Sequence, residues 1–499
     1  MQLTEEQVRL IFGLKLRQIR AEKDLSLLGL SKITGLSKSY LNEMEKGKKY
    51  PKPDKILALA QALEKPFDEM VSMKLTGKMA PLGDIIMSGI LKEIPLELFG
   101  IDAHNLIDII AGAPEKVTAF IGTLFEIARN SDVTRESFYL AALRSYQESR
   151  GNYFPDIEAE AKKFAQRYQL DLTGKLTSTD LEEILTEEFG YSIDYDRLGK
   201  EDYPEEIRSV YIPLEKRLLI AGIVSETQRV FILAKELGYA HMGIRQRPLT
   251  FTWIKFESFE DVLNNFHASY FAGALILPED RLVADVKTFF QKKTWDAEAF
   301  LNIMFEYTDS AETFFQRLTN LLPTHLGLGQ IFFLRFTFNE ELDEIVLAKE
   351  LHLSRSHRPH SFKNQEHYCR RWLSTGILLN DQKHSEIDDV RAGAQRSMYH
   401  DSEDEYLVLA ASNADPFIDK HMRSVCIGIE LSEAQSEHIA FLEDDSIVKK
   451  VVGVTCERCA VTDCESRGHP SVILDQKSRD AEIEKRVYSL INRKASSTT

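Results

Sequence analysis

The stretch from Leu25 to Gly47 constrains the fold more than any other part of the sequence. It holds two short segments with the apolar spacing of helices, residues 27–33 and 38–45, on either side of Gly35. Glycine readily adopts the positive φ that ends a helix sharply, and Ser37 can cap the helix that follows. The pattern therefore predicts two short helices joined by a tight turn. The apolar residues predicted to pack between them are Leu30, Leu41 and Met44.

This stretch resembles the helix-turn-helix of lambda-repressor-like (XRE) regulators, and the flanking apolar patterns predict five short helices over residues 8–71. The resemblance implies that the second helix of the motif enters the major groove of double-stranded DNA and that a homodimer binds a two-fold operator. Leu27 stands where the family usually has glutamine, which removes one expected phosphate contact. A helical bundle without a role at DNA is the alternative. The predicted DNA-contacting residues are Lys38, Ser39, Tyr40, Asn42, Glu43, Lys46, Lys48 and Lys49.

The charge is unevenly distributed along the chain. The whole sequence has a net charge of −16, with 62 Lys and Arg against 78 Asp and Glu. Residues 1–75 hold 14 basic and 10 acidic side chains, so this part is net basic while the rest is strongly acidic. A net basic N-terminal part on an otherwise acidic chain is consistent with a polyanion that contacts only residues 1–75. The charge distribution alone does not decide whether the chain binds a polyanion.

Residues 228–241 resemble the helix of ImmA/IrrE-type metallopeptidases, which carry a His-Glu-x-x-His core. Histidines at i and i+4 share one helix face and bind zinc, while the glutamate acts as a base. Here the two histidine positions are Lys235 and Tyr239, and only Glu236 remains. His267 stands where the family has its third ligand, a glutamate. The resemblance implies a zincin-like fold, and the lost ligands predict that the protein is not an enzyme.

A metal-free pocket of this kind invites another ligand. Cationic side chains and an aromatic ring in the same region suit a phosphate-bearing ligand with an adenine. The alternative is that basic residues gather there by chance. The candidate ligand-binding residues are Arg208, Arg217, Lys235, Tyr270 and Arg317.

Three of the five cysteines form a Cys-x2-Cys-x4-Cys run, Cys456, Cys459 and Cys464. Thiolates this close usually bind a metal in a reducing compartment. Their softness suits zinc or an iron–sulfur cluster, and the spacing does not choose between them. Three free cysteines in a loop are the alternative. The fourth ligand is missing from the run, and the candidates for it are Cys369, Cys426, His469 and Arg467.

The order of these motifs, with residues 146–155 and 317–328 between them, resembles the short-chain fatty acyl-CoA regulator family of XRE transcription factors. The resemblance spans most of residues 8–475. It implies a regulator of short-chain fatty acid metabolism that senses CoA or an acyl-CoA. For the cysteines and Arg467 it implies a four-iron (4Fe-4S) cluster. The alternative is a toxin–antitoxin or phage-type regulator whose peptidase-like domain binds a protein partner.

The expected architecture is multidomain, mainly α with α+β parts. The predicted domains are a helix-turn-helix domain at 1–72, a linker at 73–102, a helical and ImmA/IrrE-like ligand-binding domain at 103–330, and an α+β sensor-like domain with the cysteine cluster at 331–499. Within them, the predicted helices are 181–189, 227–241, 259–275 and 476–494. The predicted strands are 210–213, 217–221, 331–338, 344–351, 406–411 and 425–431.

No apolar run approaches the ~20 residues that a membrane helix needs. The start of the sequence has neither the basic region nor the apolar region of a signal peptide. A soluble cytoplasmic protein with no membrane partner is therefore expected.

Overall fold

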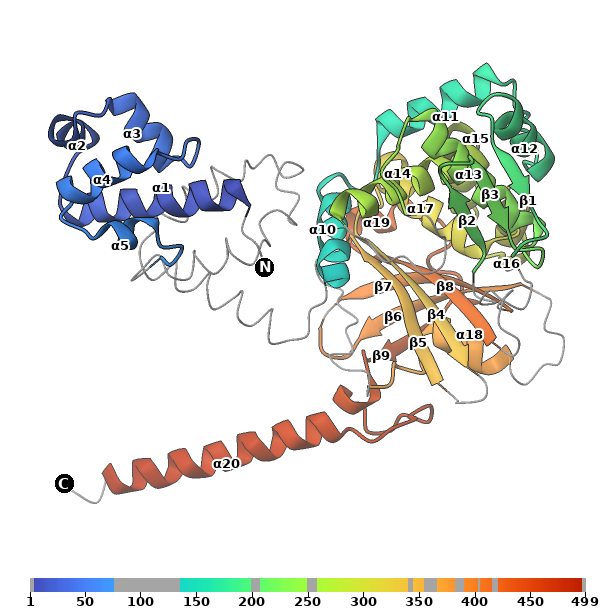
Figure 1. Cartoon of the computed structure of the whole chain (residues 1–499). Coiled ribbons are helices and arrows are strands. Elements are labelled where there is room, and N and C mark those ends of the chain that lie inside the picture. Colours follow the sequence, from blue (N-terminus) through green and yellow to red (C-terminus); the bar gives the residue numbers. More distant parts are fainter. Residues whose placement is uncertain are drawn as a thin grey trace. The chain divides into compact units, whose positions relative to one another are not determined.

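The structure is a computed structural model that describes residues 4–75, 135–198, 207–248, 258–339, 344–353, 366–381, 390–402, 404–414 and 421–495. The chain divides into two compact units (Figure 1). The first unit comprises Met1–Tyr146 with Phe256–Phe259, and the second comprises Gln147–Lys255 with Glu260–Thr499. Most of the predicted linker and residues 103–134 of the predicted ligand-binding domain lie outside the described residues. No helix in the described part of the chain is long and apolar enough to cross a membrane.

The first unit contains the five short helices that the sequence predicts. Gly35 ends the second of them with φ 70°, and Ser37 caps the third by accepting a hydrogen bond from the backbone N–H of Tyr40. A Cβ on Gly13 would lie 2.3 Å from the carbonyl oxygen of Met44, so the first and third helices cross in close contact. The predicted packing residues are confirmed, since Leu30, Leu41 and Met44 are fully buried. The helices are α1 (Glu5–Glu22), α2 (Leu27–Thr34), α3 (Lys38–Glu45), α4 (Pro53–Ala62) and α5 (Phe67–Val71).

The first half of the second unit combines helices with a three-stranded sheet (Figure 1). In this sheet β3 (Arg217–Ile220) is central, parallel to β1 (Ser192–Asp194) and antiparallel to β2 (Ser209–Ile212). The two strands and three helices predicted in this region are confirmed to within a few residues. The helix α10 (Arg135–Ser149) leads into this part from the first unit. The other helices are α11 (Pro155–Arg167), α12 (Ser178–Glu187), α13 (Glu226–His241), α14 (Phe259–Ile276), α15 (Glu279–Phe290), α16 (Ala297–Phe305) and α17 (Ala311–Leu326).

The second half is built on a six-stranded sheet of order β5-β4-β8-β7-β6-β9. All neighbours are antiparallel except β6 and β9, which run parallel. Four of the strands match predicted ones, and β6 and β9 were not predicted. The strands are β4 (Ile331–Asn339), β5 (Glu344–His352), β6 (Arg391–Tyr399), β7 (Glu405–Ala414), β8 (His421–Glu430) and β9 (Val448–Val452). The remaining elements are α18 (Leu373–Asp381), α19 (Glu433–Ser436), a 3₁₀ turn η3 (Cys456–Arg458) and α20 (Val472–Ala495).

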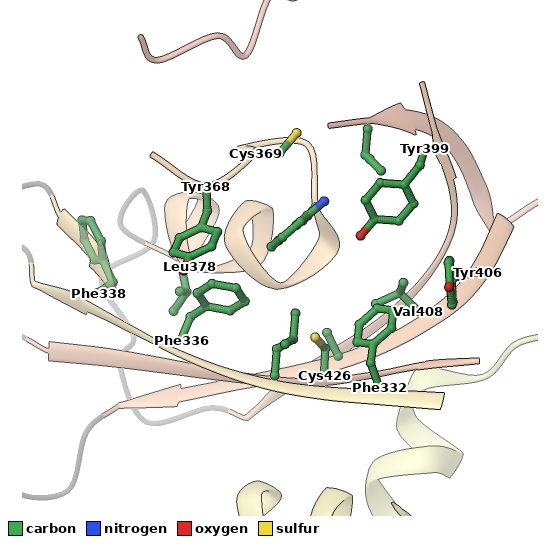
Figure 2. Close-up of a cluster of buried hydrophobic side chains, with 14 residues drawn as sticks. Phe332, Phe336, Phe338, Tyr368, Cys369, Leu378, Tyr399, Tyr406, Val408 and Cys426 are labelled. Carbon is green, nitrogen blue, oxygen red and sulfur yellow. The ribbon is translucent and has the colours of Figure 1, made fainter. Parts of the chain in front are cut away.

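An aromatic core fills the space between this curved sheet and α18 (Figure 2). Phe332, Phe336 and Tyr406 are buried in it. Phe332 faces Gly428 across the β4–β8 pair, and a Cβ there would lie 2.1 Å from the phenylalanine ring. The glycine therefore makes room for the ring. Figure 2 shows Cys369 at the border of this core, with its sulfur directed away from the aromatic rings.

The predicted boundary between residues 330 and 331 falls inside the second unit, in the short link between α17 and β4. Ion pairs bridge this link. Glu312 of α17 binds Arg335 of β4 at 2.9 Å and also contacts Lys349 of β5. The two cations hold the pKa of Glu312 down to about 2 despite its burial. Helix and sheet are thus joined by charge as well as by apolar packing.

Candidate functional site

The predicted DNA-contacting residues lie on α3 and on the turn that follows it. Lys38, Ser39, Lys46, Lys48 and Lys49 are exposed. Asn42 and Glu43 are half-buried on the same helix, whose other side is buried through Leu41, Met44 and Glu45. Tyr40 is also half-buried and packs against the apolar core of the first unit, so its ring is only partly available to DNA.

Two acidic residues of α3, Glu43 and Glu45, form ion pairs with different surroundings. Lys49 binds Glu43 at 2.8 Å, and this hydrogen bond raises the pKa of Lys49. Glu45 instead points inward, where Arg20 of α1 grips both of its oxygens at 2.6 and 2.9 Å. The first pair sets the charge of the outer surface, whereas the second fixes how α3 sits on α1.

The helix α13 carries Glu236, which forms a buried ion pair within the chain. Arg247 donates to Glu236 Oε2 at 2.7 Å and to Oε1 with its other terminal nitrogen. Its guanidinium lies 3.9 Å from the ring centroid of Tyr239 and 4.2 Å from that of Tyr211. Both partners are nearly inaccessible, with 4 % and 8 % of their side chains exposed. A cation from the chain thus neutralises the surviving glutamate.

Lys235 and Tyr239, at the two former histidine positions, share a partner on α14. Asn265 Oδ1 accepts from Lys235 Nζ at 2.6 Å and from the Tyr239 hydroxyl at 3.2 Å. Burial lowers the pKa of Lys235 to about 7. The ring of His267 packs against Phe154 and Phe266, and burial lowers its pKa to about 4. Asn265 is therefore an α14 residue that accepts hydrogen bonds from both Lys235 and Tyr239. No pattern in the sequence indicated that Asn265 or Arg247 would belong to this site.

Tyr270 and Arg317 belong to a different buried network, centred on Glu158 of α11. Arg317 binds both Glu158 oxygens at 2.6 and 2.8 Å and the carbonyl of Leu277 at 3.0 Å. The Tyr270 hydroxyl donates to Glu158 at 2.7 Å and accepts from the backbone N–H of Phe154 at 3.2 Å. Arg317 is 1 % exposed. The network joins α11, α14 and α17, so these two side chains hold the fold together.

The five predicted ligand residues have different surroundings. Lys235 and Arg317 are buried in separate networks, and Arg208 lies just before β2. Arg217 is half-exposed at the edge of an open depression beside β1. Lys235, Tyr270 and Arg317 are paired with polar or acidic groups of the chain itself, and their role in binding a ligand stays a prediction. The depression is lined by residues 192–197 and Arg217.

Four cysteines line one small pocket at the end of the six-stranded sheet. Cys369 joins Cys456, Cys459 and Cys464 in the lining of this pocket, whose cavity volume is about 10 Å³. Backbone pairing brings the two segments together: the N–H of Cys369 donates to Val454, and that of Cys456 donates to His367. Among the four candidates for the missing ligand, the structure thus places Cys369 beside the run.

The other candidates have different surroundings. Cys426 lies within the aromatic core (Figure 2), where burial raises its pKa to about 12. His469 stacks on His367 outside the pocket lining. Arg467 lines the pocket, but its guanidinium donates to the carbonyls of Cys456 at 3.0 Å, Cys459 at 3.2 Å and Val461. In this arrangement the Arg467 guanidinium, which has no acceptor site, is engaged in positioning the cysteine loop, and its role at a metal stays a prediction.

The pocket also fits closely around its sulfurs. The backbone N–H of Gly453 donates to Cys369 Sγ at 3.5 Å. A Cβ on the same glycine would lie 3.0 Å from Cys459 Sγ. Burial raises the pKa of the Cys369 thiol, and a bound metal would favour the thiolate. Four soft sulfur donors with a backbone N–H aimed at one of them fit a zinc ion or an iron–sulfur cluster.

Comparisons with known proteins agree with the two sequence motifs. The helix-turn-helix family profile matches residues 16–70, and the IrrE N-terminal-like domain profile matches residues 186–319. The chain is 26 % identical over 332 residues to the HTH-type transcriptional regulator RamB of Mycobacterium tuberculosis, covering 62 % of this chain and 65 % of RamB. It is 24 % identical over 287 residues to the regulator PrpR of the same organism, covering 54 % of this chain and 56 % of PrpR.

The chain therefore spans less than two thirds of the length of these relatives in the matched regions. A solved structure of a Mycobacterium tuberculosis transcriptional regulator matches 66 % of this chain and 92 % of its own, at 20 % identity and a TM-score of 0.46, which is too low to support an inference. The comparisons establish that the chain contains a helix-turn-helix domain and an IrrE N-terminal-like domain, and that it is similar to HTH-type transcriptional regulators.

Proposed function

We propose that this chain is a DNA-binding transcriptional regulator and not a peptidase. The observation that carries the proposal is the helix-turn-helix whose α3 presents polar and basic side chains outward. The sequence of α13 supports the second half, because Arg247 pairs with Glu236 and the two histidine positions of the His-Glu-x-x-His pattern hold Lys235 and Tyr239. The similarity to the regulators RamB and PrpR points the same way.

The predicted DNA-contacting residues fall into two groups, those suited to bases and those suited to phosphates. Asn42 carries the amide that can pair with an adenine edge, and Lys38 at the start of α3 can reach a base as well. Lys46 and Lys48, on the turn after α3, suit phosphates. Lys49 is partly neutralised by Glu43 and contributes less positive charge. As is usual for this motif, we propose a homodimer on a two-fold operator.

The test selects the operator from random DNA with the full-length protein and then measures binding by anisotropy. Asn42→Ala and Lys38→Ala should each cost about 1–3 kcal/mol and relax the preference at one position. Lys48→Ala should weaken binding to every sequence and reduce the salt dependence. Lys162→Ala, on the exposed side of α11 in the second unit, is the control. Unchanged operator affinity in the Asn42/Lys38 double variant would exclude α3 as the reading helix.

The cofactor that we propose for the cysteine pocket is a 4Fe-4S cluster held by Cys369, Cys456, Cys459 and Cys464. Such a cluster supplies a one-electron centre whose potential responds to hydrogen bonds on its sulfurs. Tetrahedral zinc, the alternative, holds its sulfurs about 3.8 Å apart. Iron and zinc analysis of protein purified without oxygen decides between the two cofactors.

The proposed effector is CoA or an acyl-CoA, bound in the second unit. The proposal rests on the resemblance of the motifs to acyl-CoA regulators. One partly exposed member of the predicted set is Arg217, which lines the depression beside β1 with Arg197 and Tyr195. Asp194 and Asp196 line it too, so phosphates would have to avoid them. Calorimetry of the full chain with CoA and Arg217→Ala is the test, and a folded protein that binds no CoA would favour a protein partner.

A further inference from the structure

A second group of metal-ligand side chains lies beside the cysteine pocket. His367, Glu457 and His469 each offer one ligand atom, and the three atoms lie within 4.8 Å of one another. They come from three separate segments: the residues before Cys369, the η3 turn, and the loop after Cys464. The proposed DNA binding, effector binding and cysteine cofactor use none of these three residues.

The backbone holds Glu457 and His367 in place. The Glu457 side chain is 7 % exposed, and its Oε2 accepts from the backbone N–H of His367 at 3.0 Å. Its Oε1 lies 2.7 Å from His367 Nδ1. The two segments are also joined by the antiparallel bridge between Tyr368 and Thr455. The carboxylate is therefore oriented by a main-chain donor, as ligands of metal sites usually are.

His469 is brought to the same place by the loop that follows the cysteines. Its ring stacks on that of His367, with 3.2 Å between centroids and 10° between planes. The preceding residue, Gly468, packs on Arg370 so closely that a Cβ there would lie 2.6 Å from its Nε. A larger side chain at residue 468 would require the Arg370 side chain to move, so the glycine allows the loop to lie against it.

The neighbouring cations have acidic or carbonyl partners of their own. Arg458, next in the chain to Glu457, binds both oxygens of Glu366 at 2.6 and 2.7 Å. Arg467 donates to three backbone carbonyls of the cysteine loop. Both positive charges are thus directed to other groups, and the Glu457 carboxylate faces two imidazoles.

We propose that His367, Glu457 and His469 bind one divalent transition-metal ion, such as zinc. Two imidazole nitrogens and one carboxylate oxygen are a common zinc set, at about 2.0–2.2 Å from the ion, and three protein ligands leave a position for water. The ion takes the place of the hydrogen between Nδ1 and Oε1, and the two rings turn apart so that one nitrogen lone pair of each faces it. His367 is 42 % exposed, which gives the ion a path from solvent.

Such an ion would fasten the loop that carries Cys464. That loop runs from Cys459 to His469, and an ion on His469 ties its far end to the η3 turn and to the Cys369 segment. Slower hydrogen exchange over residues 460–469 on addition of zinc is the expected structural signature. This consequence does not depend on which cofactor the cysteines hold.

The experiment uses the full-length chain, purified without oxygen and dialysed against a chelator, with its iron and zinc contents measured first. Calorimetric titration with zinc should then show one further ion per chain. Glu457→Gln and His469→Ala should each weaken this binding at least ~10-fold, since even changes outside the ligand shell cost that much. His438→Ala, an exposed histidine elsewhere in the second unit, should bind zinc as the wild type does.

Cys459→Ser separates this site from the cysteine pocket. Retention of the titrated zinc in Cys459→Ser, together with its loss in Glu457→Gln, supports the proposal. Zinc binding that is lost in Cys459→Ser but kept in Glu457→Gln places the ion on the cysteines and overturns it. A wild-type protein that takes up no further zinc overturns it as well. Glu457→Gln keeps the size and the backbone hydrogen bond of the side chain, so it decides the question even where His469→Ala fails to fold.

Discussion

Replacing Arg317 by methionine should lower the free energy of unfolding of the second unit by about 3–5 kcal/mol. The change leaves the carboxylate of Glu158, 8 % exposed, without the guanidinium that binds both of its oxygens. Burying an unpaired charge is expensive because the low dielectric of the interior does not replace the lost hydration. The carbonyl of Leu277 loses a donor at 3.0 Å in the same step.

The assay is urea unfolding followed by tryptophan fluorescence and circular dichroism, with a control ion pair that also involves α11. Lys162 of α11 binds Asp280 of α15 at 2.7 Å, but their side chains are 63 % and 78 % exposed. Asp280→Asn should therefore cost only about 0–1 kcal/mol. A double variant, Glu158→Leu with Arg317→Met, removes both charges and should recover much of the loss.

The outcome also bears on ligand binding. If Arg317 contacts an effector directly, Arg317→Met would weaken that ligand without a matching loss of stability. An Arg317→Met protein as stable as Asp280→Asn would refute the assignment of Arg317 to the Glu158 network. So would a double variant that loses as much as the two single variants together.

Three further changes test other parts of the second unit. Because burial lowers the pKa of Lys235 to about 7, against about 10.4 in an unfolded chain, the unfolded state binds more protons between these values and wild-type stability should rise with pH across pH 7–10. Lys235→Met should lose that rise, and equal slopes for the two proteins in urea unfolding would contradict the burial argument. Cys369→Ser should lower the iron content as much as Cys459→Ser does, while Cys426→Ala should leave the iron content unchanged. A Cys369→Ser protein that keeps the iron content of the wild type would exclude Cys369 from the site. Gly453→Ala should displace the Cys459 sulfur, 3.0 Å from the added carbon, and reduce cofactor content, whereas Gly329→Ala, with open space around it, should not.

Local signals in the sequence were enough to predict the helices of the first unit. Gly35 and Ser37 end one helix and begin the next through their own backbone and side-chain chemistry, so their effect does not depend on distant residues. The strand β6 was missed for the opposite reason. Its residues 392–395, Ala-Gly-Ala-Gln, have little β propensity, and they are extended because β7 pairs with them, with β9 joining on the other side from Gln395 onward.

The candidate sites likewise combine residues that local sequence patterns identify with residues that only the tertiary fold brings near. The run from Cys456 to Cys464 could be read from spacing alone, but its fourth sulfur comes from Cys369, which only the pairing of two distant segments brings near. The departure of Lys235 and Tyr239 from the His-Glu-x-x-His pattern is visible in the sequence. The pairing of Arg247 with Glu236 is not, because nothing in the sequence around Arg247 indicates that it folds back on this carboxylate. Partners in a buried network depend on tertiary packing, which periodicity does not report.

A cofactor in the cysteine pocket would also reduce the conformational freedom of the unfolded chain. Cys369 and Cys456 are roughly ninety residues apart, and β6, β7, β8 and β9 all lie between them. A cofactor bound to both closes a loop that contains most of the six-stranded sheet. Cross-linking a loop of about 100 residues removes freedom from the unfolded chain equivalent to roughly 4–5 kcal/mol in the disulfide case. Loss of the cofactor would restore that freedom to the unfolded state, so the whole β6–β9 part of the sheet, and not only the turn that carries the cysteines, would become easier to unfold.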